Sequence, residues 1–177
     1  MRRALGIACL ATGIVVATAP LSHATSVQRL TLEQTVQRAD RIVHATVTGM
    51  HSGRDEAGLP ATWITLQIVQ TLKGAQRKQL VIKQYGVAEA LADGSVARIA
   101  GLPRYAVGEE VVLFLHPDSR RGFTSPVGLG QGCYRINRAA ARPRLRPRLR
   151  LRRDVDGGAT DLDEFLSTVQ RLTTADQ

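Results

Sequence analysis

Residues 61–72 read ATWITLQIVQTL, and this stretch decides the fold class of the chain. The aliphatic residues Ile64, Leu66 and Ile68 occupy every second position, and the positions between them are mostly polar or aromatic. A period of two residues is typical of a β-strand with one buried face, because successive side chains point to opposite sides. Lys73–Gly74 then breaks the pattern, so the sequence predicts a strand over residues 61–72.

Similar patterns predict further strands at residues 41–50, 79–85, 110–116, 123–127 and 132–137. Residues 111–115 read VVLFL, and such a continuous apolar strand is typical of burial on both faces. Between the strands we expect a loop at 51–60, a loop with a short helix at 88–92, and a glycine-rich corner at 128–132.

Helices are predicted only near the two ends of this strand-rich region. Residues 30–39 read as a short helix, with Thr31 and Gln34 spaced as in a capping box. Residues 160–174 read as a second helix capped by Thr160. Its apolar stripe consists of Leu162, Phe165, Leu166, Val169 and Leu172.

This order of elements predicts a mostly β fold: a small antiparallel β-barrel of the oligonucleotide/oligosaccharide-binding (OB) type with flanking N- and C-terminal helices. Strands and helices do not alternate as a parallel sheet requires. We expect one such domain over residues 25–177.

The first 24 residues resemble an export signal. A basic Met1–Arg3 head precedes a small, apolar stretch over residues 4–19, and Ser22–His23–Ala24 fits a signal peptidase site. The apolar stretch is shorter than the roughly 20 residues of a membrane-spanning helix. We therefore predict a signal peptide cleaved after Ala24, a periplasmic or secreted mature chain, and no transmembrane segment in that chain.

The predicted mature chain contains one cysteine, Cys133. Exported proteins that depend on disulfides carry an even set of cysteines. Cys133 is therefore interpreted as a small buried apolar residue, with a disulfide to another chain as the alternative.

The net charge of +9 comes from two short segments. Arg2 and Arg3 leave with the predicted signal peptide, and the rest comes from residues 142–153, which read RPRLRPRLRLRR. The remainder of the chain is formally neutral. An electrostatic function would therefore belong to this arginine run.

In an extended conformation the arginine run would place its arginines on one face and its prolines and leucines on the other. One interpretation is an edge strand with a solvated arginine face, which Pro143 and Pro147 fit. A disordered tail is another, although the leucines argue against it. The third is a binding face for an anionic partner, made by Arg142, Arg144, Arg146, Arg148, Arg150 and Arg152.

Guanidinium groups suit phosphates and carboxylates. The expected partners of the run are therefore lipopolysaccharide or phospholipid head groups, an acidic polysaccharide, or an acidic protein surface. Export argues against nucleic acid as the natural partner.

The sequence carries no recognisable catalytic or metal motif. The histidines after residue 24 are His44, His51 and His116, and none are four residues apart as in helical zinc sites. The Gly128–Gly132 stretch leads into a strand, whereas a phosphate-binding loop opens a helix. We predict no cofactor, no metal site and no enzymatic activity. A hydrolase would require His44, His116 and Cys133, or carboxylates, to meet in the folded chain.

Most of the aromatic residues fall in the predicted strands. They provide either a ligand-stacking face or core packing, and their small number favours the core. The residues concerned are Trp63, Tyr85, Phe114, Phe123 and Tyr134.

Several short motifs resemble a family of uncharacterised exported bacterial proteins. They are Leu32–Glu33, Ala39–Val43, Leu72–Gly74, Val107–Leu115, Gly130–Gly132 and Leu162–Leu166. The Ala39–Asp40 start of one strand and the Lys73–Gly74 end of the next are also similar to the netrin-like domain of tissue metalloproteinase inhibitors, which has an OB-type barrel. That resemblance implies a protease-associated factor with an exported protease as partner. Those inhibitors chelate zinc through an N-terminal cysteine, whereas the predicted mature start here is Thr25–Ser26–Val27, so the inhibitory chemistry does not carry over.

Overall fold

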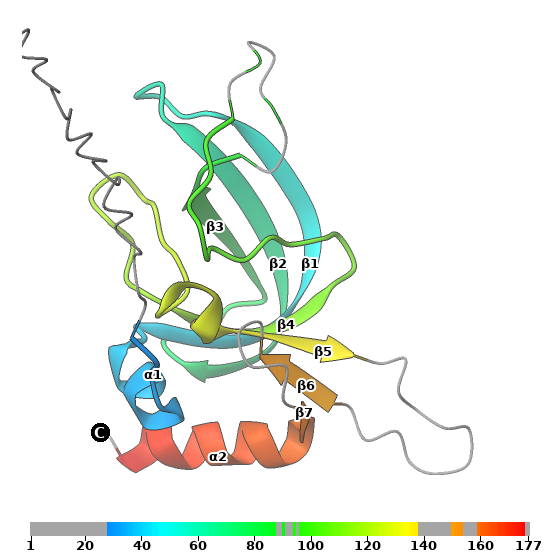
Figure 1. Cartoon of the computed structure of the whole chain (residues 1–177). Coiled ribbons are helices and arrows are strands. Elements are labelled where there is room, and N and C mark those ends of the chain that lie inside the picture. Colours follow the sequence, from blue (N-terminus) through cyan, green and yellow to red (C-terminus); the bar gives the residue numbers. More distant parts are fainter. Residues whose placement is uncertain are drawn as a thin grey trace, which may run out of the picture.

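The chain folds into one antiparallel sheet with two helices at one end (Figure 1). The computed structural model describes residues 28–87, 90, 94, 96–137, 150–153 and 159–175. The strands are β1 (Arg41–Arg54), β2 (Pro60–Lys73), β3 (Gln79–Tyr85), β4 (Glu110–Leu115), β5 (Cys133–Asn137), β6 (Arg150–Arg153) and β7 (Ala159–Asp161), and the helices are α1 (Leu32–Arg38) and α2 (Leu162–Ala175). A mostly β fold with flanking helices is therefore confirmed.

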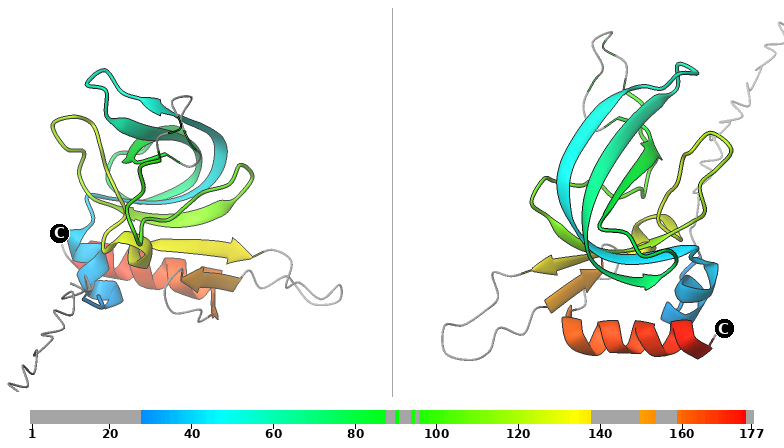
Figure 2. Two further views of the ribbon diagram at one scale, coloured as in Figure 1. Left: turned by 45° about the horizontal axis from the view of Figure 1, so that its top comes forward. Right: turned by 180° about the vertical axis from the view of Figure 1, so that it is seen from behind.

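The strand order is β3–β2–β1–β4–β5–β6–β7, and every neighbouring pair is antiparallel. The last two strands are short, with four and three residues. The sheet curls strongly around a coil of residues 96–108, as the two views of Figure 2 show. Closure into an OB-type barrel stays a prediction.

The β1–β2 hairpin is longer than the sequence predicts. Residues 51–60 were expected to form a loop, yet β1 continues to Arg54 and β2 begins at Pro60. The Asp55 carboxylate accepts hydrogen bonds from the amides of Ala57 (3.0 Å) and Leu59 (2.8 Å), which closes a tight turn. The register shifts at three places along the hairpin, and such bulges bend a strand pair.

Two hydrophobic cores lie on opposite faces of β1 and β4. β4 is buried at all six positions, which confirms the prediction for residues 111–115. The helix-side core consists of Leu30, Val36, Ala39, Ile42, Leu72, Val112, Phe114, Val127, Tyr134, Ile136, Leu162, Phe165 and Val169. The concave core consists of Val43, Ala45, Val47, Ile64, Leu66, Leu80, Ile82, Tyr105, Val111, Leu113, Leu115 and Cys133.

Both predicted helices are present, and one of the two predicted N-caps is wrong. Thr31 and Gln34 form the predicted capping box of α1. In α2 the buried residues include Leu162, Phe165 and Val169. Thr160 was expected to cap this helix, but it lies within β7, and the Asp161 carboxylate accepts from the amides of the first turn instead.

The segment after β4 also differs from the prediction. Residues 123–127 form two isolated bridges, Lys83 with Phe123 and Leu115 with Pro126, and no continuous strand. The glycine-rich stretch is the expected tight corner, with a 3-10 turn at Leu129–Gly132. A Cβ atom on Gly132 would come within 2.6 Å of the Val127 carbonyl oxygen, so only glycine fits there.

Several sequence predictions lie outside the described residues. They include the signal peptide at 1–24, most of the short helix expected at 88–92, and the arginine run from Arg142 to Leu149.

Candidate functional site

The arginine run enters the described structure as β6, between β5 and β7. The edge-strand interpretation is therefore wrong for residues 150–153, because β7 covers their outer side. β6 is aligned so that Arg152 is the cross-strand partner of Arg135, and Arg150 that of Asn137. Of the six predicted binding residues, the structure thus positions the backbone of Arg150 and Arg152, while Arg142, Arg144, Arg146 and Arg148 lie outside the described residues.

Arg135 is the basic residue among the four β5 residues that pair with the described end of the run. It is the cross-strand partner of Val111, a residue of the concave core, so it lies on the concave face. Its guanidinium forms an ion pair with Glu109 and donates a hydrogen bond to the carbonyl oxygen of Arg104. The sequence analysis did not single out Arg135, because only the register of β5 with β6 brings it beside the run.

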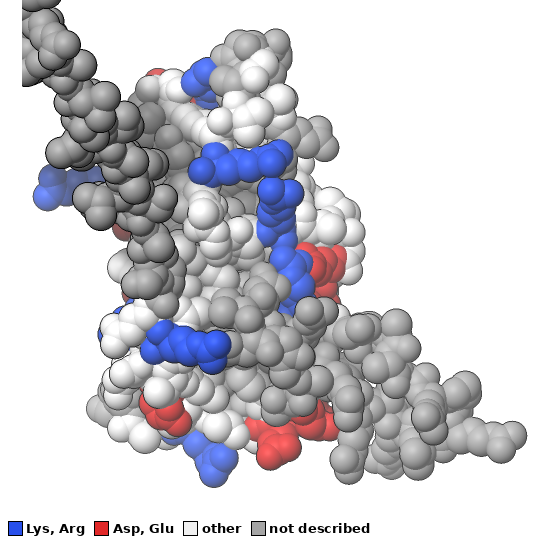
Figure 3. All heavy atoms as spheres, viewed as in Figure 1, with Lys and Arg blue, Asp and Glu red and all other residues white. Residues whose placement is uncertain are grey.

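A basic surface extends from Arg135 over the concave face. Arg98 and Arg104, in the coil that crosses this face, are both exposed. Figure 3 looks onto the coil and shows basic side chains following one another down the molecule. We call Arg98, Arg104 and Arg135, together with the β6 strand that pairs with β5, the basic face.

A cavity of about 350 Å³ lies between the coil and the inner side of β1–β3. Met50, Ile64, Val87 and Leu102 contribute apolar walls. The remaining lining residues are Thr62, Gln84, Tyr85, Gly86, Ala97, Arg98, Ile99, Ala100, Gly101, Pro103, Arg104 and Tyr105. Sequence reasoning missed this cavity, because its lining comes from three strands and the coil that crosses them, and no local sequence pattern pairs these segments.

His44 and Cys133, two of the residues that a hydrolase would need, do not come together. His44 and Cys133 lie opposite Val112 and Leu113 of β4 respectively. Neighbouring residues of one strand face opposite sides of a sheet, so the His44 and Cys133 side chains are separated by the sheet. His116 follows β4 at the start of a turn, where its backbone bonds to Ser125 and Thr124.

His44 instead forms a buried pair that the sequence did not suggest. Its Nε2 lies 2.7 Å from Oε1 of Glu110, and each side chain is only 7 % exposed. Both residues lie on the helix-side face of the sheet, away from the cavity. The pair has a structural role, because each buried polar group supplies the hydrogen-bonding partner that the other one needs.

The aromatic residues divide between core and surface. Phe114 and Tyr134 pack with Phe165 in the helix-side core, with ring centroids 4.6–6.3 Å apart. This confirms the core prediction for those two. Trp63, Tyr85 and Phe123 belong to neither hydrophobic core, since Trp63 and Phe123 are half-buried and Tyr85 is exposed, so the core prediction is wrong for them.

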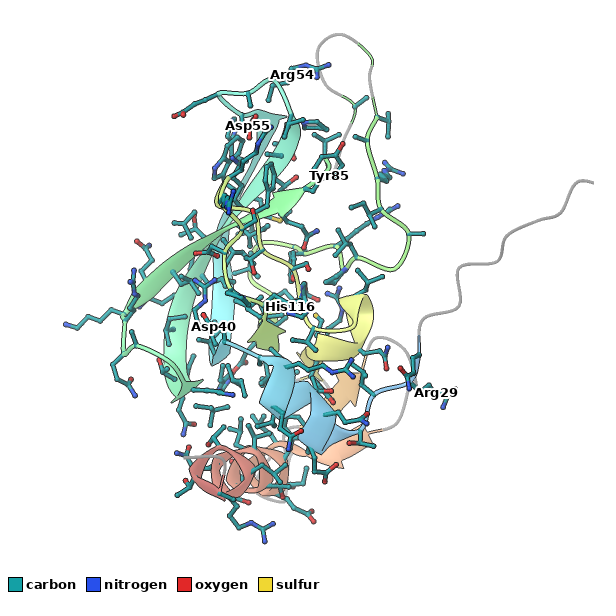
Figure 4. The ribbon with its side chains drawn as sticks, turned by 90° about the vertical axis from the view of Figure 1, so that its left-hand side faces the viewer. Arg29, Asp40, Arg54, Asp55, Tyr85 and His116 are labelled. Carbon is teal, nitrogen blue, oxygen red and sulfur yellow. The ribbon has the colours of Figure 1, made fainter. Side chains whose placement is uncertain are left out.

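Two of these rings, Trp63 and Phe123, contact one lysine. The Lys83 ammonium lies 4.2 Å from the Phe123 ring centroid and 5.8 Å from that of Trp63, and it bonds to Asp55 at 2.8 Å. That bond, with the amides of Leu59 and Ala57, lowers the pKa of the Asp55 carboxyl below its ordinary 3.8. Figure 4 shows Asp55 and Tyr85 at the end of the sheet farther from the helices.

Within the described ranges, no group of three or more His, Cys, Asp or Glu side chains is placed to hold a metal ion. None of the helices in that part of the chain is long and apolar enough to cross a membrane. Comparison with known proteins gave no matching family model and no matching curated sequence.

Proposed function

We propose that this chain is an exported, non-enzymatic binding protein whose basic face docks an acidic or anionic partner. The observation that carries the proposal is the pairing of β5 with β6, in which Arg152 lies opposite Arg135. This pairing joins the arginine run to basic residues of the folded domain.

The pairing of two arginines is electrostatically unfavourable by itself. Like charges directly opposite on neighbouring strands destabilise a sheet. Glu109 pairs with Arg135 and offsets one of the two charges. Guanidinium groups bind carboxylates and phosphates in a two-point geometry, so arginines on neighbouring strands suit a partner that carries these groups.

Arg98 and Arg104 enlarge the same surface, and the rest of the run at Arg142–Arg148 adds further charge of one sign. A surface of one sign attracts oppositely charged partners over about a Debye length, so the association should weaken with salt. An acidic protein surface, an acidic polysaccharide and anionic lipid head groups share this chemistry.

Binding is favoured over catalysis by the composition of the cavity. Its described lining contains no His, Cys, Ser, Lys, Asp or Glu side chain, and these groups supply most general bases and nucleophiles. The curled sheet also supports the OB-type barrel as part of the proposal. The alternative function, a protease-associated factor, rests on the netrin-like resemblance alone.

The test compares two variants that lose the same charge. In the first, Arg144, Arg146, Arg148 and Arg150 are changed to Gln. In the second, the exposed arginines Arg38, Arg77, Arg120 and Arg171, distributed over other surfaces, are changed to Gln. Both are titrated with a poly-glutamate peptide, an acidic polysaccharide and phosphatidylglycerol vesicles at several salt concentrations.

We expect the mature chain to bind at least one probe with an affinity that falls as salt rises. The first variant should lose most of this binding and the second should keep it. Equal losses in both variants would mean that total charge alone matters, and this outcome, or no binding of any probe, would refute the proposal.

A further inference from the structure

The cavity on the concave face has a lining suited to one class of small molecule. We propose that it binds a compact apolar molecule that carries a carboxylate. This inference goes beyond the docking of an acidic partner, because it concerns a half-open cavity and a small ligand with an apolar body.

The shape of the site is set by the sheet on one side and the coil on the other. Ile64 and Tyr105 line the cavity and also belong to the concave core, so the apolar floor is continuous with that core. A volume of about 350 Å³ falls at the lower end of the range of small-molecule sites. The site therefore suits a short apolar body.

Three hydrogen bonds hold the walls of the cavity together. The Gln84 amide nitrogen donates to the Pro103 carbonyl (3.1 Å), which ties β3 to the coil. The Val87 amide donates to the carbonyl of Ala97 (2.9 Å), and a Cβ on Gly86 would come within 2.8 Å of that same oxygen. The Thr62 hydroxyl donates to the Gly86 carbonyl (2.8 Å). A site built this way exists before the ligand arrives, so binding requires little ordering of the chain.

The charges around the cavity select for an acid. Arg98 and Arg104 are exposed and line its open side. No acidic side chain lies among its described lining residues. A cleft lined by charge of one sign concentrates ligands of the opposite sign, and a carboxylate at the mouth would leave the apolar body on the floor.

Octanoate is a suitable probe, because it combines an eight-carbon body with one carboxylate. Octanol and octylamine share the body and differ in the charge of the head group. We would follow each by isothermal titration and by NMR chemical shifts of the lining residues, using the full mature chain.

Two variants test the site. Arg98→Gln with Arg104→Gln removes the positive charge at the mouth, while Arg77→Gln with Arg171→Gln is the control with equal charge loss. Ala100→Trp places a large side chain at the exposed rim, where it should fill the opening without disturbing the core. Circular dichroism checks that all variants are folded.

We expect octanoate to bind more tightly than octanol or octylamine and to shift resonances of the lining residues. The Arg98/Arg104 variant should weaken octanoate binding by about tenfold or more, since charge-assisted hydrogen bonds are lost. Ala100→Trp should abolish it. The variant of Arg144–Arg150 should bind octanoate normally, which separates this inference from the docking function.

Three outcomes would overturn the inference. They are the absence of octanoate binding at millimolar concentration, equal binding of octylamine, and octanoate binding that survives both the Arg98/Arg104 and the Ala100→Trp changes. The last would identify nonspecific association with exposed apolar surface.

Discussion

His44 and Glu110 form a buried polar pair inside the helix-side half of the sheet. Their 2.7 Å contact lies on adjacent strands, where each group would otherwise be removed from water without this partner. Removing one member of such a pair leaves the other inadequately bonded, which costs about 3 kcal/mol. We therefore expect His44→Leu and Glu110→Leu, each of which removes one hydrogen-bonding partner, to lower the free energy of unfolding by roughly that amount.

A double-mutant cycle separates this contact from general loss of packing. The two changes together should destabilise the protein less than the sum of the single changes, with a coupling of about 1 kcal/mol or more. Urea unfolding of the four proteins measures it. Strictly additive effects would show that the two side chains do not support one another.

Asp55 gives the protein a component of stability that depends on pH. Because the Lys83 hydrogen bond lowers the pKa of its carboxyl in the folded state, the ionised form is favoured by folding. This stabilisation is fully present when the pH is above the ordinary aspartate pKa of 3.8. It is lost as the pH falls through the lower pKa of the folded state.

Asp55→Asn removes that component. We expect its urea midpoint to lie below that of the unaltered chain at pH 7, and the difference to shrink as the pH falls below 3.8. Glu56→Gln, at the exposed carboxylate next to Asp55 in the chain, serves as the control for general acid effects. A difference that stays constant from pH 7 to pH 2.5 would contradict the role of the Asp55–Lys83 bond.

At the scale of single elements, α1 depends on its capping box. The Thr31 hydroxyl accepts from the Gln34 amide at 3.2 Å, and the Gln34 side chain accepts from the Thr31 amide at 3.0 Å. Thr31→Ala should lower the free energy of unfolding by about 1 kcal/mol, while Thr31→Ser should keep most of it. Equal stability of the two variants in urea would show that the cap contributes nothing.

Elements with a strong local pattern could be predicted from the sequence. β3 occupies the predicted residues 79–85, and α1 has the predicted cap, because both follow from neighbouring side chains. The turn end of the β1–β2 hairpin could not be predicted. Backbone pairing extends both strands through polar residues that lie outside the hydrophobic core. Residues 123–127 read FTSPV, and Pro126 has no amide hydrogen to donate, so this segment forms two isolated bridges and no continuous strand.

The candidate site was predicted less well than the fold, for a related reason. A charge run is visible in the sequence, but the register that aligns Arg152 with Arg135 is not. The cavity likewise forms only when the coil of residues 96–108 crosses the sheet. Both features depend on contacts between distant segments, which a single sequence does not pair.

For the whole molecule, the central fact is that β1 and β4 belong to both hydrophobic cores. Val43 and Leu113 face the concave core, while Ile42 and Val112 face the helix-side core. Neither core can lose its packing without exposing a strand that the other one requires. The domain should therefore unfold as one cooperative unit, as single domains of this size usually do.

Trp63 allows this cooperativity to be measured, because it is the one tryptophan of the chain. It lies on the outer face of β2, whereas Phe165 packs from α2 into the helix-side core. Phe165→Ala should remove about 3–5 kcal/mol of stability. In a cooperative domain the urea midpoints seen by Trp63 fluorescence and by far-ultraviolet circular dichroism should fall together. Leu66→Ala, which opens the concave core, should lower both midpoints in the same way. If Phe165→Ala shifts the helix signal but leaves the Trp63 transition in place, the two faces of the sheet are independently stable and the shared strands do not couple them.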